Sequence, residues 1–373
     1  MKTASRSVPA QVNVRLLAFY LPQYHPIPEN DEWWGKGFTE WTNVAKARPL
    51  FKGHDQPHLP ADLGFYDLRL PEVREAQADL AKAHGIHGFC YYHYWFNGRR
   101  LLNRPFDEIR ASGRPDFPFC LCWANESWTR RWDGFEQEIL LGQDYNDEDL
   151  VAHARWLTGA FADPRYIRVD GRPLFLVYRA ARLPDSRRAC DIWRREVVRS
   201  GLPEPFLCRV ESFGDEHSDP VAAGFDAAVE FQPDWTRLPR RIRTARRWAW
   251  LGRLLGENRA FDVNEVREYA DLAAAARSKP NTPYLRFPCV APGFDNTARH
   301  PSTGATVFHR PSPEVYASWL RHAVERVNPL SPSHRIVFIN AWNEWGEGAH
   351  LEPCQTWGHT FLEATRSVLL AAR

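Results

Sequence analysis

The stretch Arg335–Gly348 reads RIVFINAWNEWGEG and joins an apolar run to a polar turn. The apolar run, Arg335–Ala341, has the continuous hydrophobicity of a strand that is buried on both faces. Two glutamates, Glu344 and Glu347, follow it within a glycine-bearing turn. Ionised carboxylates are buried only when they are paired with a positive charge or have a functional role. Packing alone therefore does not explain two of them directly after a buried strand.

Enzymes that act on glycosidic bonds usually use two carboxyl groups in unlike environments. One is kept protonated as the acid, and the other is ionised as the base or nucleophile. The simpler alternative is a surface turn with charged residues, since paired glutamates are common in turns. The position of Glu344 and Glu347 at a strand end favours the catalytic interpretation.

Eight apolar runs alternate along the chain with segments of helical periodicity. Eight strands that are each followed by a helix predict an α/β fold, the (β/α)8 TIM barrel, with long loops after the strands. The strands are expected at Val14–Tyr20, Ile86–Tyr92, Phe117–Trp123, Pro173–Tyr178, Phe206–Val210, Ala227–Phe231, Tyr284–Val290 and Arg335–Ala341. The helices are expected at Glu72–His84, Arg104–Ser112, Asp147–Ala160, Ser186–Ser200, Asp215–Ala223, Val263–Ser278, Pro313–Val327 and Gly358–Ala371.

The segments that follow the strands are long and rich in Trp, Tyr, His and Pro, whereas those that lead into strands are short. A TIM barrel carries its active site on the loops after the strands, so the loop composition agrees with the fold prediction. No internal repeat or interdomain linker is visible. We therefore expect a disordered tail at residues 1–13 and a single domain over residues 14–373.

The composition, 44% hydrophobic and 25% charged, is that of a soluble globular protein. The aromatic content is high, with 16 Trp, 12 Tyr and 22 Phe, which suits the apolar faces of sugars, although many of these rings will be core. The net charge of +2 gives no support for a nucleic-acid partner. No apolar stretch reaches the roughly 18 residues of a membrane span, and no signal region is visible, so we expect a cytoplasmic protein.

Seven cysteines, an odd number, lie mostly in apolar strand-like runs, where they behave as small hydrophobes. This usage fits a reduced cytosol. Cys120 and Cys122 do not have the spacing of a zinc site, and no second cysteine pair accompanies them. We expect neither a metal nor a cofactor.

Polar and aromatic side chains gather at several predicted strand ends. This mixture suits a site for a polyhydroxylated ring, although each group taken alone also has an ordinary structural explanation. The predicted catalytic residues are Glu344 and Glu347. The predicted substrate-binding residues are Tyr20, Tyr24, His25, Glu40, Trp41, Tyr92, His93, Trp95, Trp123, Asn125, Glu126, Trp342, Asn343 and Trp345.

Five motifs spread along the chain are long enough to be specific. They are GFTEWTNV at 37–44, GHDQP at 53–57, DLGFYD at 62–67, WANE at 123–126 and WNEWGEG at 342–348. With these motifs the chain resembles the WbsX-type family found with bacterial polysaccharide biosynthesis, which is labelled both glycosyltransferase and glycoside hydrolase family 99-like. The resemblance covers nearly the whole chain, from Val14 to Leu370.

This resemblance implies a (β/α)8 enzyme that retains anomeric configuration. In family 99 endo-α-mannosidases, the first Glu of an E-W-x-E motif takes the proton of the substrate's 2-hydroxyl, which attacks the anomeric carbon and gives a 1,2-anhydro sugar. The second Glu protonates the leaving group. The resemblance thus implies Glu344 as base and Glu347 as acid/base. The mannosidases have His where this chain has Gly346 and Gln where it has His350, so mannose specificity is not implied.

Alternatives remain for both roles and reaction. The pair Asn125–Glu126 has the Asn-Glu form of acid/base residues in many retaining glycosidases, which would make Glu126 the acid and Glu344 a covalent nucleophile. Otherwise Glu126 would bind sugar hydroxyls. A glycosyltransferase or transglycosylase of O-antigen or capsule biosynthesis would pass the sugar to an acceptor, but the chain has no glycine-rich phosphate loop. A non-catalytic glycan-binding barrel would need no carboxylate pair.

The segment 235–260 holds eight Arg against a single acid, Glu257. It reads as a basic amphipathic insertion that bears Trp and could lie on anionic lipid headgroups. The alternative is a helix packed on the barrel with a solvated basic face. The membrane interpretation predicts a peripheral protein at the inner membrane and a lipid-linked oligosaccharide, rather than a free glycan, as its partner.

Overall fold

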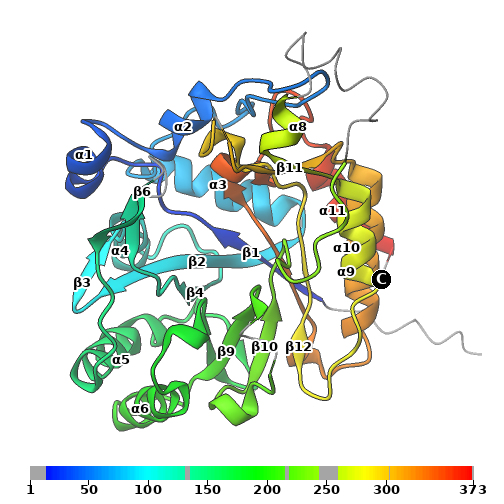
Figure 1. Ribbon diagram of the computed structural model, residues 1–373. Helices are drawn as coiled ribbons and strands as arrows, with labels where there is room; N and C mark the ends of the chain where they lie inside the picture. The colour runs from blue at the N-terminus through cyan, green and yellow to red at the C-terminus, as the bar shows by residue number, and fades with distance from the viewer. Residues whose placement is uncertain (1–13, 131–134, 215–217, 243–258, 302, 372–373) are drawn as a thin grey trace, which may run out of the picture.

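The computed structural model describes residues 14–130, 135–214, 218–242, 259–301 and 303–371. Nine strand segments form one sheet in the order β12-β10-β9-β8-β4-β2-β1-β15-β13, and every neighbouring pair is parallel (Figure 1). The segments are β1 (Arg15–Tyr20), β2 (Ile86–Phe96), β4 (Phe119–Trp123), β8 (Arg172–Val177), β9 (Phe206–Glu211), β10 (Ala227–Glu230), β12 (Arg286–Phe287), β13 (Cys289–Val290) and β15 (Ile336–Ile339).

The two ends of this sheet are consecutive pieces of one strand. β12 pairs with β10, and β13 pairs with β15. Pro288 separates the pieces because it has no backbone N–H to give to a ladder. Its carbonyl oxygen still accepts a hydrogen bond from Phe338 N at 2.8 Å. The sheet therefore closes into a barrel of eight strands, and the predicted (β/α)8 fold is confirmed.

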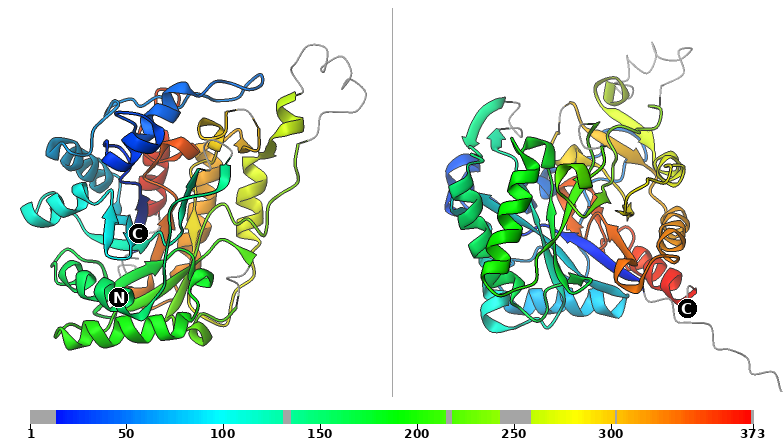
Figure 2. Two further views of the ribbon diagram at one scale, coloured as in Figure 1. Left: turned by 60° about the vertical axis from the view of Figure 1, so that its left-hand side comes forward. Right: turned by 90° about the horizontal axis from the view of Figure 1, so that it is seen from below.

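Helices cover the outside of this barrel (Figure 2). α10 packs against both α9 and α11, and α5 packs against α6. Ser312 caps α10 through a hydrogen bond to Val315 N, and Pro313 occupies its first turn, so this helix has the predicted bounds. The helices that follow barrel strands include α3 (Pro71–Ala83), α4 (Arg104–Ser112), α5 (Asp147–Phe161), α6 (Ser186–Arg199), α9 (Tyr269–Arg277), α10 (Pro313–Val327) and α11 (Thr360–Ala371).

An aromatic cluster fills the barrel near the strand ends. Phe19 of β1 lies with its ring centroid 5.7 Å from Tyr92, 5.3 Å from Phe231 and 5.5 Å from Phe338. These residues come from four different strands or strand ends, so the core itself fixes where the following loops begin. All seven cysteines are buried free thiols, as expected for small hydrophobes.

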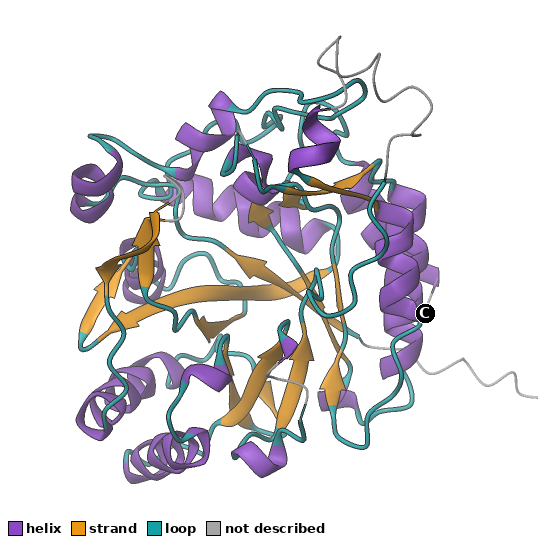
Figure 3. Ribbon diagram, viewed as in Figure 1, coloured by secondary structure: helices purple, strands orange, loops and turns teal. Residues whose placement is uncertain are grey.

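The long loops carry structure that the sequence analysis did not predict (Figure 3). These additions include α1 (Pro28–Trp34), α2 (Glu40–Lys46), β3 (Arg99–Leu101), β5 (Trp128–Arg130), β6 (Phe135–Leu141), β11 (Glu265–Glu268), β14 (Thr306–His309), β16 (Asn343–Glu344) and β17 (Ala349–His350). The helix predicted from Val263 is wrong at its start, because β11 pairs in parallel with β14. Of the helix predicted to end at Ala223, the described part forms only a 3-10 turn, Val221–Ala223.

Two predicted segments lie wholly or mainly outside the described residues. One is the tail at residues 1–13. The other is the basic insertion 235–260, of which only 235–242 and 259–260 are described. Its first residue, Trp235, packs edge-on against Phe294 at 5.6 Å and so belongs to the barrel. In the described ranges, no helix combines the length and the apolar character that a membrane span requires.

Candidate active site

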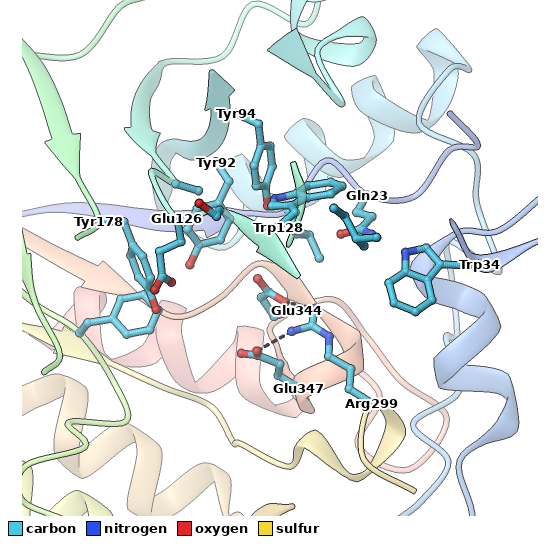
Figure 4. A pocket seen from close by; sticks show the side chains of 15 residues that line it. Gln23, Trp34, Tyr92, Tyr94, Glu126, Trp128, Tyr178, Arg299, Glu344 and Glu347 are labelled. Carbon is cyan, nitrogen blue, oxygen red and sulfur yellow. Dashed lines mark hydrogen bonds and ion pairs between the residues drawn. The ribbon is translucent and has the colours of Figure 1, made fainter. Parts of the chain in front are cut away.

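A cavity of about 250 Å³ opens at the ends of the barrel strands (Figure 4). Its wall comes from β2 and from the segments that follow β1, β4, β8, β10, β13 and β15, the face on which TIM barrels place their active sites. The lining residues are Leu21, Gln23, Trp34, Tyr92, Tyr94, Ala124, Glu126, Ser127, Trp128, Leu140, Tyr178, Phe231, Arg299, Glu344 and Glu347. Flat aromatic rings thus surround a small group of charges, which suits a polyhydroxylated ligand.

Both predicted catalytic residues lie in the loop after β15. Glu344 ends β16, which pairs with β17, and Glu347 ends the 3-10 turn η7 (Trp345–Glu347). Gly348 then reverses the chain with a φ of +57°, a left-handed conformation that favours glycine. The tight hairpin turns both carboxyl groups toward the cavity (Figure 4).

One guanidinium contacts both carboxyl groups. Arg299 follows the 3-10 turn η5 (Asn296–Ala298) in the loop after β13. Its Nη2 donates to Glu344 Oε2 at 2.9 Å, and its Nη1 forms an ion pair with Glu347 Oε1. Its Nε donates at 2.8 Å to a third carboxylate, that of Glu40 at the start of α2. The site is therefore a cluster of three glutamates around one arginine.

The three glutamates are buried to different degrees. The exposed fraction of the side chain is 0% for Glu40, 7% for Glu344 and 25% for Glu347. Burial raises the pKa of Glu344 to about 8; Arg299 opposes this shift, and the other two glutamates add to it. Burial also raises the pKa of Glu347. Burial thus favours the protonated form of both Glu344 and Glu347, and the positive charge of Arg299 opposes it.

Glu126 lies beside Tyr178, across the cavity from Arg299 (Figure 4). Its Oε1 accepts a hydrogen bond from Arg179 Nη1 at 2.9 Å. Asn125 fixes this arrangement, because its side chain accepts from Arg179 N at 2.8 Å and donates to Arg179 O at 2.9 Å. Asn125 was predicted to bind substrate, but it ties two loops together and does not line the cavity.

A buried polar layer supports the loop that carries Glu344 and Glu347 from behind. Glu352 accepts hydrogen bonds from Tyr66 Oη at 2.7 Å, from Trp345 Nε1 at 2.7 Å and from Gln77 Nε2 at 2.6 Å. Tyr20 Oη donates to Gln77 Oε1 at 2.7 Å. This layer holds the indole of Trp345, the residue that follows Glu344 in the sequence.

Backbone contacts fix the same loop to the end of β1. Asn343 accepts from Leu21 N at 2.7 Å and donates to Leu21 O at 3.0 Å. Tyr24 Oη donates to Asn343 O at 2.6 Å and accepts from Trp345 N at 3.1 Å. The predicted substrate-binding residues Tyr20, Tyr24, Trp41, Trp342, Asn343 and Trp345 are all buried in this supporting shell and do not line the cavity.

Comparison with known proteins identifies the family. Residues 16–365 match the model of the family described as "Glycosyltransferase WbsX". The chain belongs to the WbsX family. It is 46% identical over 367 residues to the uncharacterized protein WxcX of Xanthomonas campestris pv. campestris, in two strains. The alignment covers 98% of this chain but 51% of WxcX, so the chain spans about half the length of the curated relatives that it matches.

The fold of this WbsX-family chain is similar to that of solved glycoside hydrolases. The family 99 endo-α-mannosidase of Bacteroides thetaiotaomicron superposes with a TM-score of 0.58 and 14% identity, over 96% of this chain and 97% of that one. A structure described as a glycoside hydrolase-like protein gives a TM-score of 0.58 and 14% identity over 98% and 97%. Identities this low establish the fold alone. Family and fold together support a carbohydrate-active enzyme.

Three predicted residues of this WbsX-family chain point away from the cavity. Successive side chains of a strand alternate between its faces, and His93 and Trp95 lie on the outer face of β2. His93 Nε2 hydrogen-bonds His153 Nε2 at 3.1 Å, and Trp95 Nε1 donates to Asp149 Oδ1 at 2.9 Å, both on α5. Trp123 is fully buried, and its ring lies 4.7 Å from that of His153 on α5. These side chains bind the barrel to a helix and are not cavity residues.

His25 does not reach the cavity either. It is 1% exposed, and burial lowers its pKa to about 4, so it is an uncharged core histidine. Of the sixteen predicted site residues, the cavity is lined by Tyr92, Glu126, Glu344 and Glu347. Glu40 does not line the cavity itself but forms an ion pair with Arg299, which does.

The sequence analysis missed several residues that line the cavity. They include Gln23, Trp34, Tyr94, Trp128, Tyr178 and Arg299. The period-two alternation of β2 was a usable signal, because Tyr94 is two residues beyond Tyr92 and so faces the same way. Nothing local marks Arg299, because its partners are 259, 45 and 48 residues away in the sequence.

Proposed function

We propose that this chain is a retaining, endo-acting glycoside-cleaving enzyme of bacterial polysaccharide metabolism, with Glu344 and Glu347 as its catalytic pair. The observation that carries the proposal is the convergence of both carboxyl groups on one guanidinium inside a cavity lined with aromatic rings. A guanidinium spans only a few ångström, so the pair is closer than the roughly 10 Å beyond which two carboxyl groups no longer serve one glycosidic bond.

The chemistry proceeds in two steps. Glu344 takes the proton of the sugar 2-hydroxyl, the 2-oxygen attacks the anomeric carbon, and the bond to the leaving oxygen breaks as Glu347 gives that oxygen its proton. Water then opens the 1,2-anhydro sugar, with Glu347 accepting the water proton and Glu344 returning its own to the 2-oxygen. Two inversions give net retention. The greater exposure of Glu347, 25% of its side chain, supports its contact with leaving group and water.

The protonation state constrains this scheme. Glu344 must be ionised to act as a base, yet burial raises its pKa to about 8. Glu347 must be protonated to act as an acid, and burial also raises its pKa. The proposal therefore implies activity that rises toward pH 8 as Glu344 loses its proton.

Glu126 provides the alternative assignment, as the acid that partners a nucleophilic Glu344. It lines the same cavity, but its Oε1 accepts a charge-assisted hydrogen bond from Arg179. This contact fixes the carboxylate of Glu126 in place, where its oxygens can accept hydrogen bonds from sugar hydroxyls. We therefore keep Glu126 as a substrate-binding residue.

The second candidate function is sugar transfer, which the family description favours. Metal-dependent nucleotide-sugar transferases use a D-x-D triplet, and this chain has one at Asp147–Asp149. It begins α5, outside the barrel, where Asp147 pairs with Arg188 and Asp149 accepts from Trp95 Nε1. The carboxylate pair therefore remains the better candidate for chemistry, whether water or an acceptor hydroxyl opens the intermediate.

We further propose that the substrate is a lipid-linked oligosaccharide, met at the cytoplasmic face of the inner membrane. The support is the sequence of segment 235–260, with its eight arginines and several indoles. Ile242 N donates to Val266 O at 2.8 Å, which joins the described part of this segment to β11.

The proposed function is tested by incubating the purified chain with defined glycans and, separately, with nucleotide sugars. Proton NMR would follow the anomeric signal of the first product. Cleavage with retained configuration supports hydrolysis or transglycosylation, whereas turnover of a nucleotide sugar alone supports the second candidate.

A further inference from the structure

Arg299 is the common partner of all three glutamates at the base of the cavity. Its Nε contacts Glu40, its Nη2 contacts Glu344 and its Nη1 contacts Glu347. These partners come from the loops after β1 and β15, while Arg299 comes from the loop after β13. The planar fork of the guanidinium therefore fixes three loops against one another with defined geometry.

Glu40 anchors the guanidinium from the protein side. It is the first residue of α2 and is fully buried. It does not line the cavity, so a ligand there does not touch it. Its contact with Arg299 Nε, at 2.8 Å, leaves Nη1 and Nη2 to face the catalytic carboxyl groups. A carboxylate so deeply buried requires such a partner, and Arg299 supplies it.

Gly346 provides the space for this pair. A Cβ at position 346 would overlap Glu40 Oε1 and would lie 2.8 Å from Glu40 Cδ and 3.0 Å from Arg299 Nε. Real Cβ atoms do not approach other atoms this closely, because atomic overlap is strongly repulsive. A side chain at position 346 and the pair Glu40–Arg299 in its present place are therefore mutually exclusive.

We propose that Arg299 is a positioning residue for the catalytic pair. Anchored by Glu40 in the space left by Gly346, it fixes Glu344 against Glu347 and keeps one of them ionised. The inference rests on the proposed catalytic roles of those two glutamates, and it adds a specific requirement for the arginine, for its anchor and for the glycine.

Electrostatics support this role. Burial raises the pKa of both Glu344 and Glu347, and for each of them Arg299 is the strongest opposing influence. Without its positive charge, adjacent carboxylates would repel each other and retain protons to higher pH. The other titratable groups around the cluster are Tyr24, Tyr92, Tyr94, Glu126 with Arg179, and Asp295 with His54. Burial raises the pKa of each of these three tyrosines, so their phenols stay neutral.

The first test is a carbon-13 NMR titration of the glutamate carboxyl groups in the full chain. The two signals are assigned from Glu344→Gln and Glu347→Gln. In Arg299→Gln, we expect the titration midpoint of at least one of them to rise by more than about one pH unit. Arg310→Gln removes an exposed arginine of the same loop and should leave both midpoints unchanged. Midpoints that stay within a few tenths of the wild type in Arg299→Gln would overturn the proposal.

Two further variants separate charge from geometry. Arg299→Lys keeps the charge but not the planar fork, so we expect a smaller midpoint shift together with a kcat lowered at least about tenfold and a KM that changes little. Gly346→Ala keeps Arg299 but displaces it, and should reproduce the shift seen in Arg299→Gln. Unchanged midpoints in Gly346→Ala would show that the anchor is not needed and would also overturn the proposal.

The titration needs no substrate, so its outcome does not depend on the proposed activity. Shifted midpoints in a chain that cleaves no glycan would uphold the positioning role of Arg299 and reject the catalytic assignment. Glycan cleavage by the wild type, together with midpoints that do not shift in Arg299→Gln, would support the catalytic assignment and reject the positioning role of Arg299.

Discussion

The carboxylate of Glu352 accepts a hydrogen bond from Trp345 Nε1 at 2.7 Å, so a buried acid holds the indole of the residue that follows Glu344 in the sequence. Glu352 also accepts from Tyr66 and Gln77, and it is 2% exposed. An amide at this position would turn an NH2 group toward donors that now point at an oxygen. We therefore expect Glu352→Gln to lower the free energy of unfolding by about 1–3 kcal/mol and to lower kcat, as measured by urea unfolding and glycan cleavage.

The matched control for that variant is Glu363→Gln, on the exposed side of α11. It makes the same chemical change without altering a buried hydrogen bond, so its stability should stay within about 0.5 kcal/mol of the wild type. Equal stability losses in the two variants would mean that the hydrogen bonds of Glu352 do not hold the loop.

Leaving-group dependence separates the proposed roles of Glu344 and Glu347. Glu347→Gln removes the acid, so activity on natural glycans should fall at least about a hundredfold, while substrates with activated leaving groups keep much of their rate. Glu344→Gln removes the base and should be poor on both. The measurement is kcat/KM for each substrate type. A loss in Glu347→Gln that is the same for both types would argue against its role as acid.

The raised pKa of Glu344 predicts how stability depends on pH. The carboxyl titrates near 4.5 in the unfolded chain and at about 8 in the folded protein, so between these values the folded state binds more protons. The contribution of Glu344 to the free energy of unfolding is therefore fully present below pH 4.5 and is lost as the pH rises to 8. Glu344→Gln removes this contribution.

Urea unfolding at pH 5 and pH 8 measures the difference. The wild type should lose about 3–4 kcal/mol more than Glu344→Gln between the two pH values. An identical pH dependence in both proteins would show that Glu344 is not held protonated by its burial.

Whether a tryptophan lines the cavity or lies on the outer face of a barrel strand predicts whether it binds glycan. Trp128 lines the cavity, whereas Trp95 lies on the outer face of β2 and donates to Asp149. We expect Trp128→Ala to raise KM at least about tenfold with little change in melting temperature, because stacking area for the sugar is lost. Trp95→Phe should lower the melting temperature and leave KM unchanged. Substrate titrations and thermal unfolding of both variants test this prediction. A raised KM in Trp95→Phe together with an unchanged KM in Trp128→Ala would contradict it.

Trp95 and Trp128 illustrate which features of the fold and the site can be predicted from the sequence and which cannot. The eight strands were predictable because buried parallel strands are continuous apolar runs, and Glu344 and Glu347 were predictable because charge directly follows one of them. The face on which His93, Trp95 or Trp123 lies depends on strand register and on the helix outside. Arg299 depends on loops that meet only in the folded chain. The sheet formed by β11 and β14 escaped prediction because its pairing is equally non-local.

Segment 235–260 predicts salt-sensitive membrane binding. Each arginine near an anionic surface contributes on the order of 1 kcal/mol, so the chain should co-sediment with phosphatidylglycerol vesicles at low salt. Replacement of Arg240, Arg243, Arg246 and Arg247 by Ser should abolish this while activity on soluble glycans is kept. The control replaces the exposed arginines Arg114, Arg188, Arg199 and Arg310 by Ser. A wild-type chain that stays in the supernatant at low salt would remove the support for a lipid-linked substrate.

The stereochemistry of the first product tests the proposed catalytic pair most directly. Proton NMR of the anomeric signal, recorded while the wild type cleaves a defined glycan, should show the configuration of the substrate retained before mutarotation. The same assay should show cleavage lost in Glu344→Gln and in Glu347→Gln. An inverted first product, or undiminished cleavage when both glutamates are replaced together, would contradict retaining catalysis by Glu344 and Glu347.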